Sequence, residues 1–318
     1  MFALVILGPT ASGKTSLAIA LSKYLRCEII SLDSALVYRK MNIGSAKPTA
    51  EELSLVKHHL IDIRDPKDSY SAADFRIDCI SKVDEISKRG ALPIICGGTM
   101  MYYKALVEGL SPLPATEEKV RAEVLAEALK IGWSKMHEKL KDIDPKSYVR
   151  LNPNDKQRIS RALEVYYQTG RSMSSFFDEH PAEACPFERF ECILLPENDD
   201  RSALRELIRK RFMQMLDLGF VEEVRALKER GDLNLNMSSM RSVGYRQIWE
   251  YLEGKYDFKS MQELAIHATS HLAKHQMTWL RGALANSSAK KLRLNIGDID
   301  NLSKILKAID PYVEKFKL

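Results

Sequence analysis

The sequence has no long apolar run and no closely paired cysteines. None of its apolar stretches approaches the roughly 20 residues that a membrane-spanning helix requires. Nothing in it resembles a secretion signal, because the first predicted strand begins at residue 2. Without a long apolar run, we expect no membrane partner. The five cysteines are scattered without a Cys-x-x-Cys pair, so we expect free thiols in a reducing cytoplasm. These are Cys27, Cys79, Cys96, Cys185 and Cys192.

The chain also lacks a strong excess of either charge. Lysine and arginine outnumber the acidic residues by 48 to 43, which gives a net charge of +5 at pH 7. A balance this mild is no evidence for a nucleic-acid partner until the positive residues are located. The length of 318 residues and the apolar content of 45% are ordinary for a globular protein of one large or two modest domains.

What the sequence does contain is a complete phosphate-binding loop of the form G-x-x-x-x-G-K-[ST]. An apolar run at residues 2–7 precedes it as a buried strand, and a helical pattern follows it. In such a loop the backbone N–H groups and the helix N-terminus converge on phosphate oxygens. Lys14 supplies a movable positive charge, and the hydroxyl of Thr15 is placed to ligate Mg²⁺. The motif comprises Gly8, Pro9, Thr10, Ala11, Ser12, Gly13, Lys14 and Thr15, and it predicts a diphosphate or triphosphate ligand.

The first 110 residues alternate between strand and helix patterns. This alternation predicts an α/β fold, with a parallel sheet covered by helices and with ligands at the carboxyl ends of its strands. Asp33, Gly97, Gly98 and Thr99 fall at those ends. The expected strands are residues 2–7, 27–32, 60–63 and 92–96, and the expected helices are residues 71–88 and 99–108.

A helical stretch interrupts this pattern. The expected helices are residues 117–130, 133–141, 154–168 and 172–178, after which residues 190–195 return as a strand. Long helices follow at 201–218, 221–230 and 260–281, with a peripheral strand and helix at the end. We therefore predict a P-loop core in two parts, 1–114 and 185–318, with an all-helical insertion domain at 115–184.

Two short segments at the strand ends carry candidate chemistry. Asp33, followed by Ser34, Ala35 and Leu36, could hold Mg²⁺ through water or accept a proton from a nucleophile. The alternative is an aspartate that only forms a turn. The pair Gly97 and Gly98 before Thr99 is either a turn that binds an anion or a base, or a tight strand-to-helix connection.

Basic residues gather in three separated segments, which suggests a polyanion larger than a nucleotide. The first opens a helix that we expect Asn154 to cap, and Arg121 could add to its surface. The second places two guanidinium groups around a glycine and an aromatic ring, a combination suited to clamping phosphate and stacking on a base. The alternatives are solvated charged faces and structural arginines. The segments are Gln157, Arg158, Ile159, Ser160 and Arg161; Arg241, Ser242, Val243, Gly244, Tyr245 and Arg246; and Lys274, His275, Gln276, Trp279 and Arg281.

In this order and spacing the motifs resemble the bacterial tRNA dimethylallyltransferase (tRNA isopentenyltransferase) family, over nearly the whole chain up to about Arg281. The resemblance rests on the phosphate loop, on Asp33 and Ser34 with Tyr38, and on residues 43–48, 97–99, 158–165, 243–246 and 273–279. The family transfers a dimethylallyl group from its diphosphate to N6 of the adenosine just 3′ of the anticodon.

The resemblance implies roles for these residues. The loop would hold the diphosphate leaving group, with Lys14 and Mg²⁺ at Thr15 neutralising its charge. Asp33 would accept a proton from the attacking amine, and Thr99 would sit beside the base or the diphosphate. The adenosine would have to leave the anticodon stack. Residues 33–36, Thr99, Arg121 and the three basic segments would contact the anticodon stem-loop, and the insertion would grip its stem. We expect a cytoplasmic, monomeric enzyme.

The sequence departs from the family at three positions. Many members carry Gln where this chain has Leu36, and members usually carry Arg where it has Ser270 and His275. We expect a weaker tRNA phosphate contact on that helix, or one moved to Lys274 and Arg281.

Three other functions remain as alternatives. A small-molecule kinase and an adenylate isopentenyltransferase would both leave the insertion and the basic segments without a role. A non-enzymatic RNA-binding module would not explain Asp33 beside an intact phosphate loop.

Overall fold

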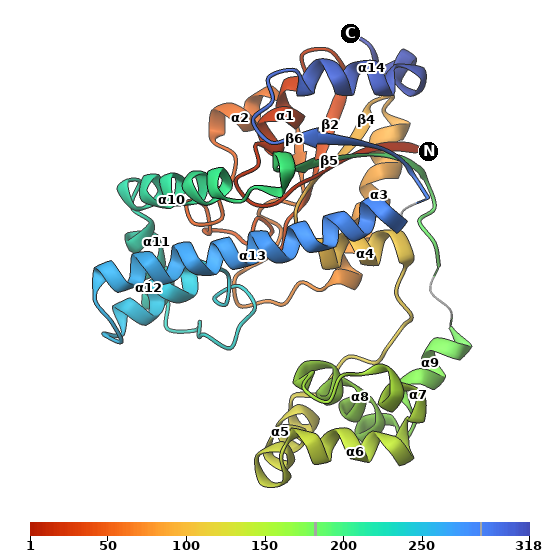
Figure 1. Ribbon diagram of the computed structural model, residues 1–318, viewed down its shortest axis with the longest axis vertical. Coiled ribbons are helices and arrows are strands. Elements are labelled where there is room, and N and C mark those ends of the chain that lie inside the picture. The colour runs from red at the N-terminus through yellow and green to blue at the C-terminus, as the bar shows by residue number, and fades with distance from the viewer. Residues whose placement is uncertain (181–182, 287) are drawn as a thin grey trace. The chain divides into compact units, whose positions relative to one another are not determined.

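The structure is a computed structural model that describes residues 1–180, 183–286 and 288–318 (Figure 1). The chain forms two compact units. Unit 1 combines Met1–Val107 with Cys185–Leu318, and unit 2 is Glu108–Ala184. Among the described residues, no helix is both long and apolar enough to cross a membrane. All five cysteines are free thiols.

Unit 1 is built on a six-stranded sheet in which every neighbouring pair is parallel. The strand order is β3-β2-β4-β1-β5-β6, so β1 lies between β4 and β5. Parallel pairing brings the carboxyl ends of all strands to one edge. The strands are β1 (Phe2–Leu7), β2 (Cys27–Leu32), β3 (His58–His59), β4 (Leu92–Gly97), β5 (Glu188–Leu195) and β6 (Lys290–Asn295).

Helices cover both faces of this sheet, which confirms the predicted fold class. Successive residues of a strand point to opposite faces, and β1 is buried on both: Ala3, Val5 and Leu7 join one core, Leu4 and Ile6 the other. The second core is closed by α1 (Lys14–Leu21) and α14 (Asn301–Val313). The first is closed by α3 (Ala72–Lys88), α4 (Met100–Glu108), α10 (Ser202–Asp217), α11 (Phe220–Glu229), α12 (Tyr245–Leu252) and α13 (Phe258–Asn286).

The third strand was predicted in the wrong place. It comprises His58–His59 and not residues 60–63. Leu60 and Asp62 have φ of 61° and 56°, in the left-handed region. A strand needs negative φ at every residue, so pairing stops at His59.

Local capping decides where several helices begin. Ser71 and Asp74 form the predicted capping box of α3. A second box, Thr49 with Glu52, starts the unpredicted helix α2 (Ala50–Leu55). The helix expected to begin at Asn154 is instead capped by Asp155, because the Asp155 side chain accepts the hydrogen bond from the backbone N–H of Arg158.

Unit 2 is entirely helical, as expected, with its own apolar core around Met136, Leu140 and Leu163. The buried carboxylate of Asp144 links two helices, since it accepts hydrogen bonds from the backbone N–H groups of Ser147 and Ser174, both at 3.0 Å. The helices are α5 (Glu118–Ile131), α6 (Trp133–Ile143), α7 (Pro145–Arg150), α8 (Lys156–Thr169) and α9 (Met173–Glu179), of which α7 was not predicted.

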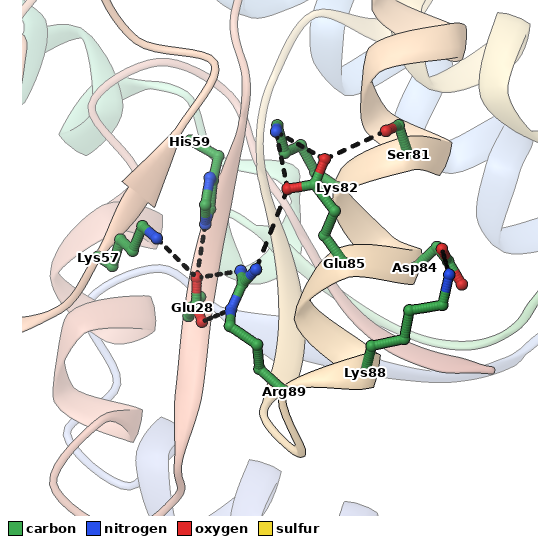
Figure 2. Close-up of polar contacts among 9 residues, drawn as sticks. All are labelled: Glu28, Lys57, His59, Ser81, Lys82, Asp84, Glu85, Lys88 and Arg89. Carbon is green, nitrogen blue, oxygen red and sulfur yellow. Dashed lines mark hydrogen bonds and ion pairs between the residues drawn. The ribbon is translucent and has the colours of Figure 1, made fainter.

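A polar network holds the end of α3 against the beginning of β2 (Figure 2). Glu28 accepts two hydrogen bonds from Arg89, at 2.9 and 2.8 Å, and a third from Nε2 of His59 at 2.7 Å. Burial alone would raise the pKa of Glu28. The hydrogen bonds from Arg89 and His59 outweigh burial and lower that pKa to about 2.

This network predicts a pH-dependent contribution to stability. A carboxylate with a depressed pKa stabilises the fold above its unfolded pKa, and the contribution is lost as pH falls from about 4.5 towards 2. Glu28→Gln should lower the free energy of unfolding by about 1–2 kcal/mol at pH 7. The difference from the native chain should shrink below pH 4.5, as measured by urea unfolding. Asp84→Asn, which removes an exposed partner of Lys88, is the control and should change little. A Glu28→Gln difference that stayed constant down to pH 3 would contradict the assignment.

Candidate functional site

A pocket of about 720 Å³ lies in unit 1 at the carboxyl ends of the central strands. Residues 10–15 of the phosphate loop form one wall, and residues 33–36 and 97–101 after β2 and β4 form another. Side chains of α10 and α13 and residues 241–245 also line it. The parallel sheet therefore brings together the phosphate loop, Asp33 and Thr99, which are far apart in sequence, as predicted from their places at the strand ends.

The phosphate loop has the backbone conformation that its glycines allow. Gly13 has a φ of 79° and directly precedes the first residue of α1, so the helix N-terminus opens at the loop. Gly8 is packed so closely that an added Cβ would lie 2.5 Å from Oγ of Ser12. Nζ of Lys14 donates a hydrogen bond to the carbonyl of Pro9 at 3.1 Å.

The charges beside the loop act on one another. Burial lowers the pKa of Lys14, while the nearby Cys96 and Asp33 raise it and Arg211 lowers it further. Burial also lowers the pKa of Arg211, and Asp33 opposes this effect. Two cations therefore flank one carboxylate, which leaves a net positive charge for an anionic ligand.

Asp33 forms a turn at the end of β2. Its Oδ1 accepts hydrogen bonds from the backbone N–H groups of Ala35 at 2.8 Å and Leu36 at 3.4 Å. Within the described part of the chain, Oδ2 makes no hydrogen bond to another residue. The turn-forming role and a chemical role are thus compatible, since each uses a different oxygen.

Thr99 is joined to the same segment. Its Oγ1 accepts a hydrogen bond from the backbone N–H of Ser34 at 3.0 Å. The glycines before it are required by close packing: a Cβ on Gly97 would lie 2.1 Å from the carbonyl oxygen of Leu32, and one on Gly98 would lie 2.7 Å from that of Gly8. The glycine pair therefore makes the tight connection that brings Thr99 beside Asp33.

Glu223 holds the start of the 43–48 loop through hydrogen bonds to its backbone. The carboxylate of Glu223 accepts hydrogen bonds from the backbone N–H groups of Asn42, Ile43 and Gly44, at 2.8, 2.8 and 3.2 Å. It also accepts one from the hydroxyl of Tyr245 at 2.6 Å. The loop's single cation, Lys47, donates to the carbonyl of Tyr38, to Asn42 and to Asp62. Its side chain is 6% exposed, so Lys47 holds the loop together.

The second basic segment separates into exposed and structural members. Arg241 lines the pocket, together with residues 242–245. Arg246 lies outside it, 3.5 Å from Glu250. Tyr245 is only 1% exposed and packs edge-to-face on Phe220. Its ring therefore offers no open face for stacking on a base. It packs against Gly44, where an added Cβ would lie 2.7 Å from the ring, and its hydroxyl donates to Glu223.

The third basic segment lies on α13 and divides between two faces of that helix. His275, Gln276 and Trp279 line the pocket. Lys274 lines a separate groove between α10 and α13. Arg281 is exposed and lines neither.

The first basic segment belongs to unit 2. Arg158 is exposed and pairs with Asp155 at 3.1 Å, and Arg121 is exposed 3.8 Å from Glu164. Arg161 is turned inward, where it donates to Thr116 and to the carbonyl of Pro114. Ile159 and Ser160 are buried, so of this segment the side chains of Gln157 and Arg158 face solvent.

Sequence reasoning missed Arg211. This residue lines the pocket from α10 and lies close enough to Asp33 and Lys14 to affect both. The sequence did contain a signal for this residue. Arg211 falls on the inward face of an amphipathic helix, together with Leu204, Ile208 and Phe212. A cation at a core-facing position is typical of a functional site.

The chain is similar to a known family and to several solved structures. A family model described as IPP transferase matches residues 36–283. A solved tRNA isopentenylpyrophosphate transferase from Bacillus halodurans is 32% identical, with a TM-score of 0.68 over 98% of this chain and 97% of that one. Its counterpart from Staphylococcus epidermidis is 31% identical, with a TM-score of 0.66 over 98% and 99%. A eukaryotic dimethylallyltransferase acting on tRNA is 25% identical, with a TM-score of 0.81 over 98% of this chain and 78% of that one.

The support of the 43–48 loop by Glu223 can be tested directly. Glu223→Ala should lower the free energy of unfolding by about 2–3 kcal/mol, because four donors lose their acceptor. Denaturant unfolding measures this change. The neighbouring Glu222 forms an exposed ion pair with Arg225, and Glu222→Ala should leave the unfolding midpoint unchanged. Equal effects of the two substitutions would show that the loop does not depend on Glu223.

Proposed function

Because this chain belongs to the IPP transferase family, we propose that it transfers a dimethylallyl group from dimethylallyl diphosphate to N6 of the adenosine 3′ of the anticodon in tRNA. The single observation that carries the proposal is the pocket in which an intact phosphate loop faces Asp33 and Arg211. The loop takes the diphosphate, and the carboxylate in the same pocket serves the acceptor.

The donor site combines positive charge with an apolar wall. Lys14, Arg211 and the N-terminus of α1 attract the diphosphate. The apolar side chains of Ile208, Phe212 and Met215 line the same pocket and suit a short hydrocarbon tail. This wall favours a prenyl diphosphate over the nucleoside triphosphate that a small-molecule kinase would bind.

The residues present also fit a magnesium ion. Mg²⁺ prefers oxygen ligands and usually takes few from the protein, with water and substrate phosphates supplying the rest. Thr15 offers a hydroxyl that lines the pocket beside the diphosphate-binding loop. In the described ranges, no group of three or more His, Cys, Asp or Glu side chains could hold a metal by itself. When bound, Mg²⁺ would neutralise charge on the departing diphosphate.

The transfer step needs a base and a positioned acceptor. The lone pair of N6 attacks C1 of the dimethylallyl group, and the C1–O bond breaks with its electrons passing to the diphosphate oxygen. The N6 proton passes to Oδ2 of Asp33, while Lys14 and Arg211 stabilise the negative charge that develops on the leaving group. Thr99 accepts a hydrogen bond from the backbone N–H of Ser34 and so holds the segment that carries Asp33 in place for the acceptor.

The tRNA contacts are proposed from exposed residues. In unit 1 these are Arg241, His275 and Trp279 at the pocket, with Lys274 and Arg281 beside it. In unit 2 they are Arg121, Gln157 and Arg158. Unit 2 would grip the anticodon stem, which offsets the few kcal/mol needed to flip the adenosine out of its stack.

An acceptor assay tests the proposal against its rivals. The protein is incubated with radiolabelled dimethylallyl diphosphate and Mg²⁺, together with unmodified tRNA, AMP or no acceptor. We expect label in the tRNA. Label in AMP would identify an adenylate isopentenyltransferase. No transfer to either acceptor would exclude the proposal.

Asp33 should be needed for chemistry and not for RNA binding. Asp33→Ala should lower kcat by about 10²–10⁴-fold, the usual contribution of a general base, while the Kd for tRNA stays within a few-fold. Single-turnover transfer and filter binding measure the two quantities. Asp84→Ala, which removes a partly exposed carboxylate on α3 outside the pocket, is the control. Turnover near the wild-type value would remove Asp33 as the base.

Arg158 should contribute to RNA affinity through phosphate contact. Arg158→Ala should weaken tRNA binding and reduce the slope of log K against log salt by about one. Lys304→Ala removes the same charge from α14, where Lys304 pairs with Asp298, and should leave the slope unchanged. If the slopes of the two variants are the same, Arg158 is not a phosphate contact.

A further inference from the structure

The side-chain amide of Gln276 joins α13 to the phosphate loop and to the end of β4. Its Oε1 accepts a hydrogen bond from the backbone N–H of Thr10 at 2.9 Å. Its Nε2 donates one to the carbonyl of Gly98 at 2.8 Å. A backbone N–H can only donate and a carbonyl can only accept, so these two partners fix the orientation of the amide.

The surroundings leave this amide little freedom. A Cβ on Gly98 would lie 2.7 Å from Nε2 of Gln276 and 2.7 Å from the carbonyl oxygen of Gly8. The backbone at Gly98 is therefore packed against both the Gln276 amide and the start of the phosphate loop. Ala273, Met277 and Leu280 of the same helix are buried in the core at 1% exposure or less. Because that face of α13 is anchored, Gln276 is presented to the loop in one position.

We propose that Gln276 is a positioning residue for the diphosphate site and not an RNA contact, an inference that rests on the proposed function. Both polar atoms of its side chain already bond protein backbone, so an RNA contact would have to share the atoms that hold Thr10 and Gly98. By holding Thr10 and Gly98 together, the amide sets the distance between the phosphate loop and the turn that leads to Thr99. A displacement of about 1 Å between binding groups is enough to weaken a site that depends on convergent donors.

Gln276→Met tests this role, because methionine fills a similar volume without the amide. We expect the Kd for inorganic pyrophosphate, titrated by calorimetry with Mg²⁺ present, to rise about tenfold. The KM for dimethylallyl diphosphate should rise in parallel. The Kd for an unmodified anticodon stem-loop RNA should change less than twofold. A purely structural role would instead lower the unfolding midpoint and the active fraction and leave both donor constants unchanged.

Two further variants keep the test decisive. Gln276→Glu retains an acceptor for Thr10, loses the donor to Gly98 and adds a negative charge, so pyrophosphate binding should weaken at least as much as in the Met variant. Gln262 lies on the same helix, outside the pocket, and donates a hydrogen bond to Sδ of Met213. Gln262→Met is the matched control and should keep wild-type constants.

The outcomes separate this inference from the proposed function. A tenfold loss of RNA affinity in Gln276→Met with unchanged pyrophosphate binding would make Gln276 an RNA contact and overturn the inference. Unchanged constants for both ligands would also overturn it. If the wild-type protein failed to bind pyrophosphate, the proposed donor site would be wrong, and the role of Gln276 with it.

Discussion

The close approach of three backbone segments at the carboxyl edge of the sheet is the constraint on which the site depends. Gly8, Gly97 and Gly98 lie where β1 and β4 end, and no Cβ fits at any of them without moving a neighbour. Parallel pairing of β4 with both β1 and β2 places this contact beside Asp33. The phosphate loop and the carboxylate are therefore held by the sheet itself, and their separation follows from strand spacing.

The site is supported by carboxylates and amides that bind backbone. Glu223 accepts hydrogen bonds from three successive backbone N–H groups, those of residues 42–44, at the start of the 43–48 loop. Gln276 connects the phosphate loop to the end of β4. Buried backbone groups without partners are costly, so one acceptor for several donors fixes a loop firmly. The side chains of motif residues such as Tyr245 and Lys47 are buried because they make these supporting contacts: Tyr245 donates to Glu223, and Lys47 donates to residues on either side of the 43–48 loop. Exposed residues beside them remain accessible to ligands.

Positive charge is distributed by function. Lys14 and Arg211 face the pocket, where they flank Asp33 and suit a diphosphate. Arg158, Lys274 and Arg281 face solvent, where screened contacts with an RNA backbone are possible. A net charge of only +5 therefore conceals two separate arrangements, one in the pocket and one on the surface, for which we propose a small anion and a polyanion as ligands.

The sequence by itself determined the α/β class, the phosphate loop and the strands that flank it, because a buried parallel strand is a continuous apolar run followed by a glycine-rich turn. It also indicated the helical insertion and the strand-end positions of Asp33 and Thr99. It misplaced β3, since the positive φ of Leu60 and Asp62 has no compositional signal. Only the tertiary structure decided that Arg211 enters the pocket, that Arg161 and Tyr245 turn inward, and that the amide of Gln276 is taken up by backbone. Which face of a helix is buried depends on packing against segments distant in sequence, and local pattern does not encode those contacts.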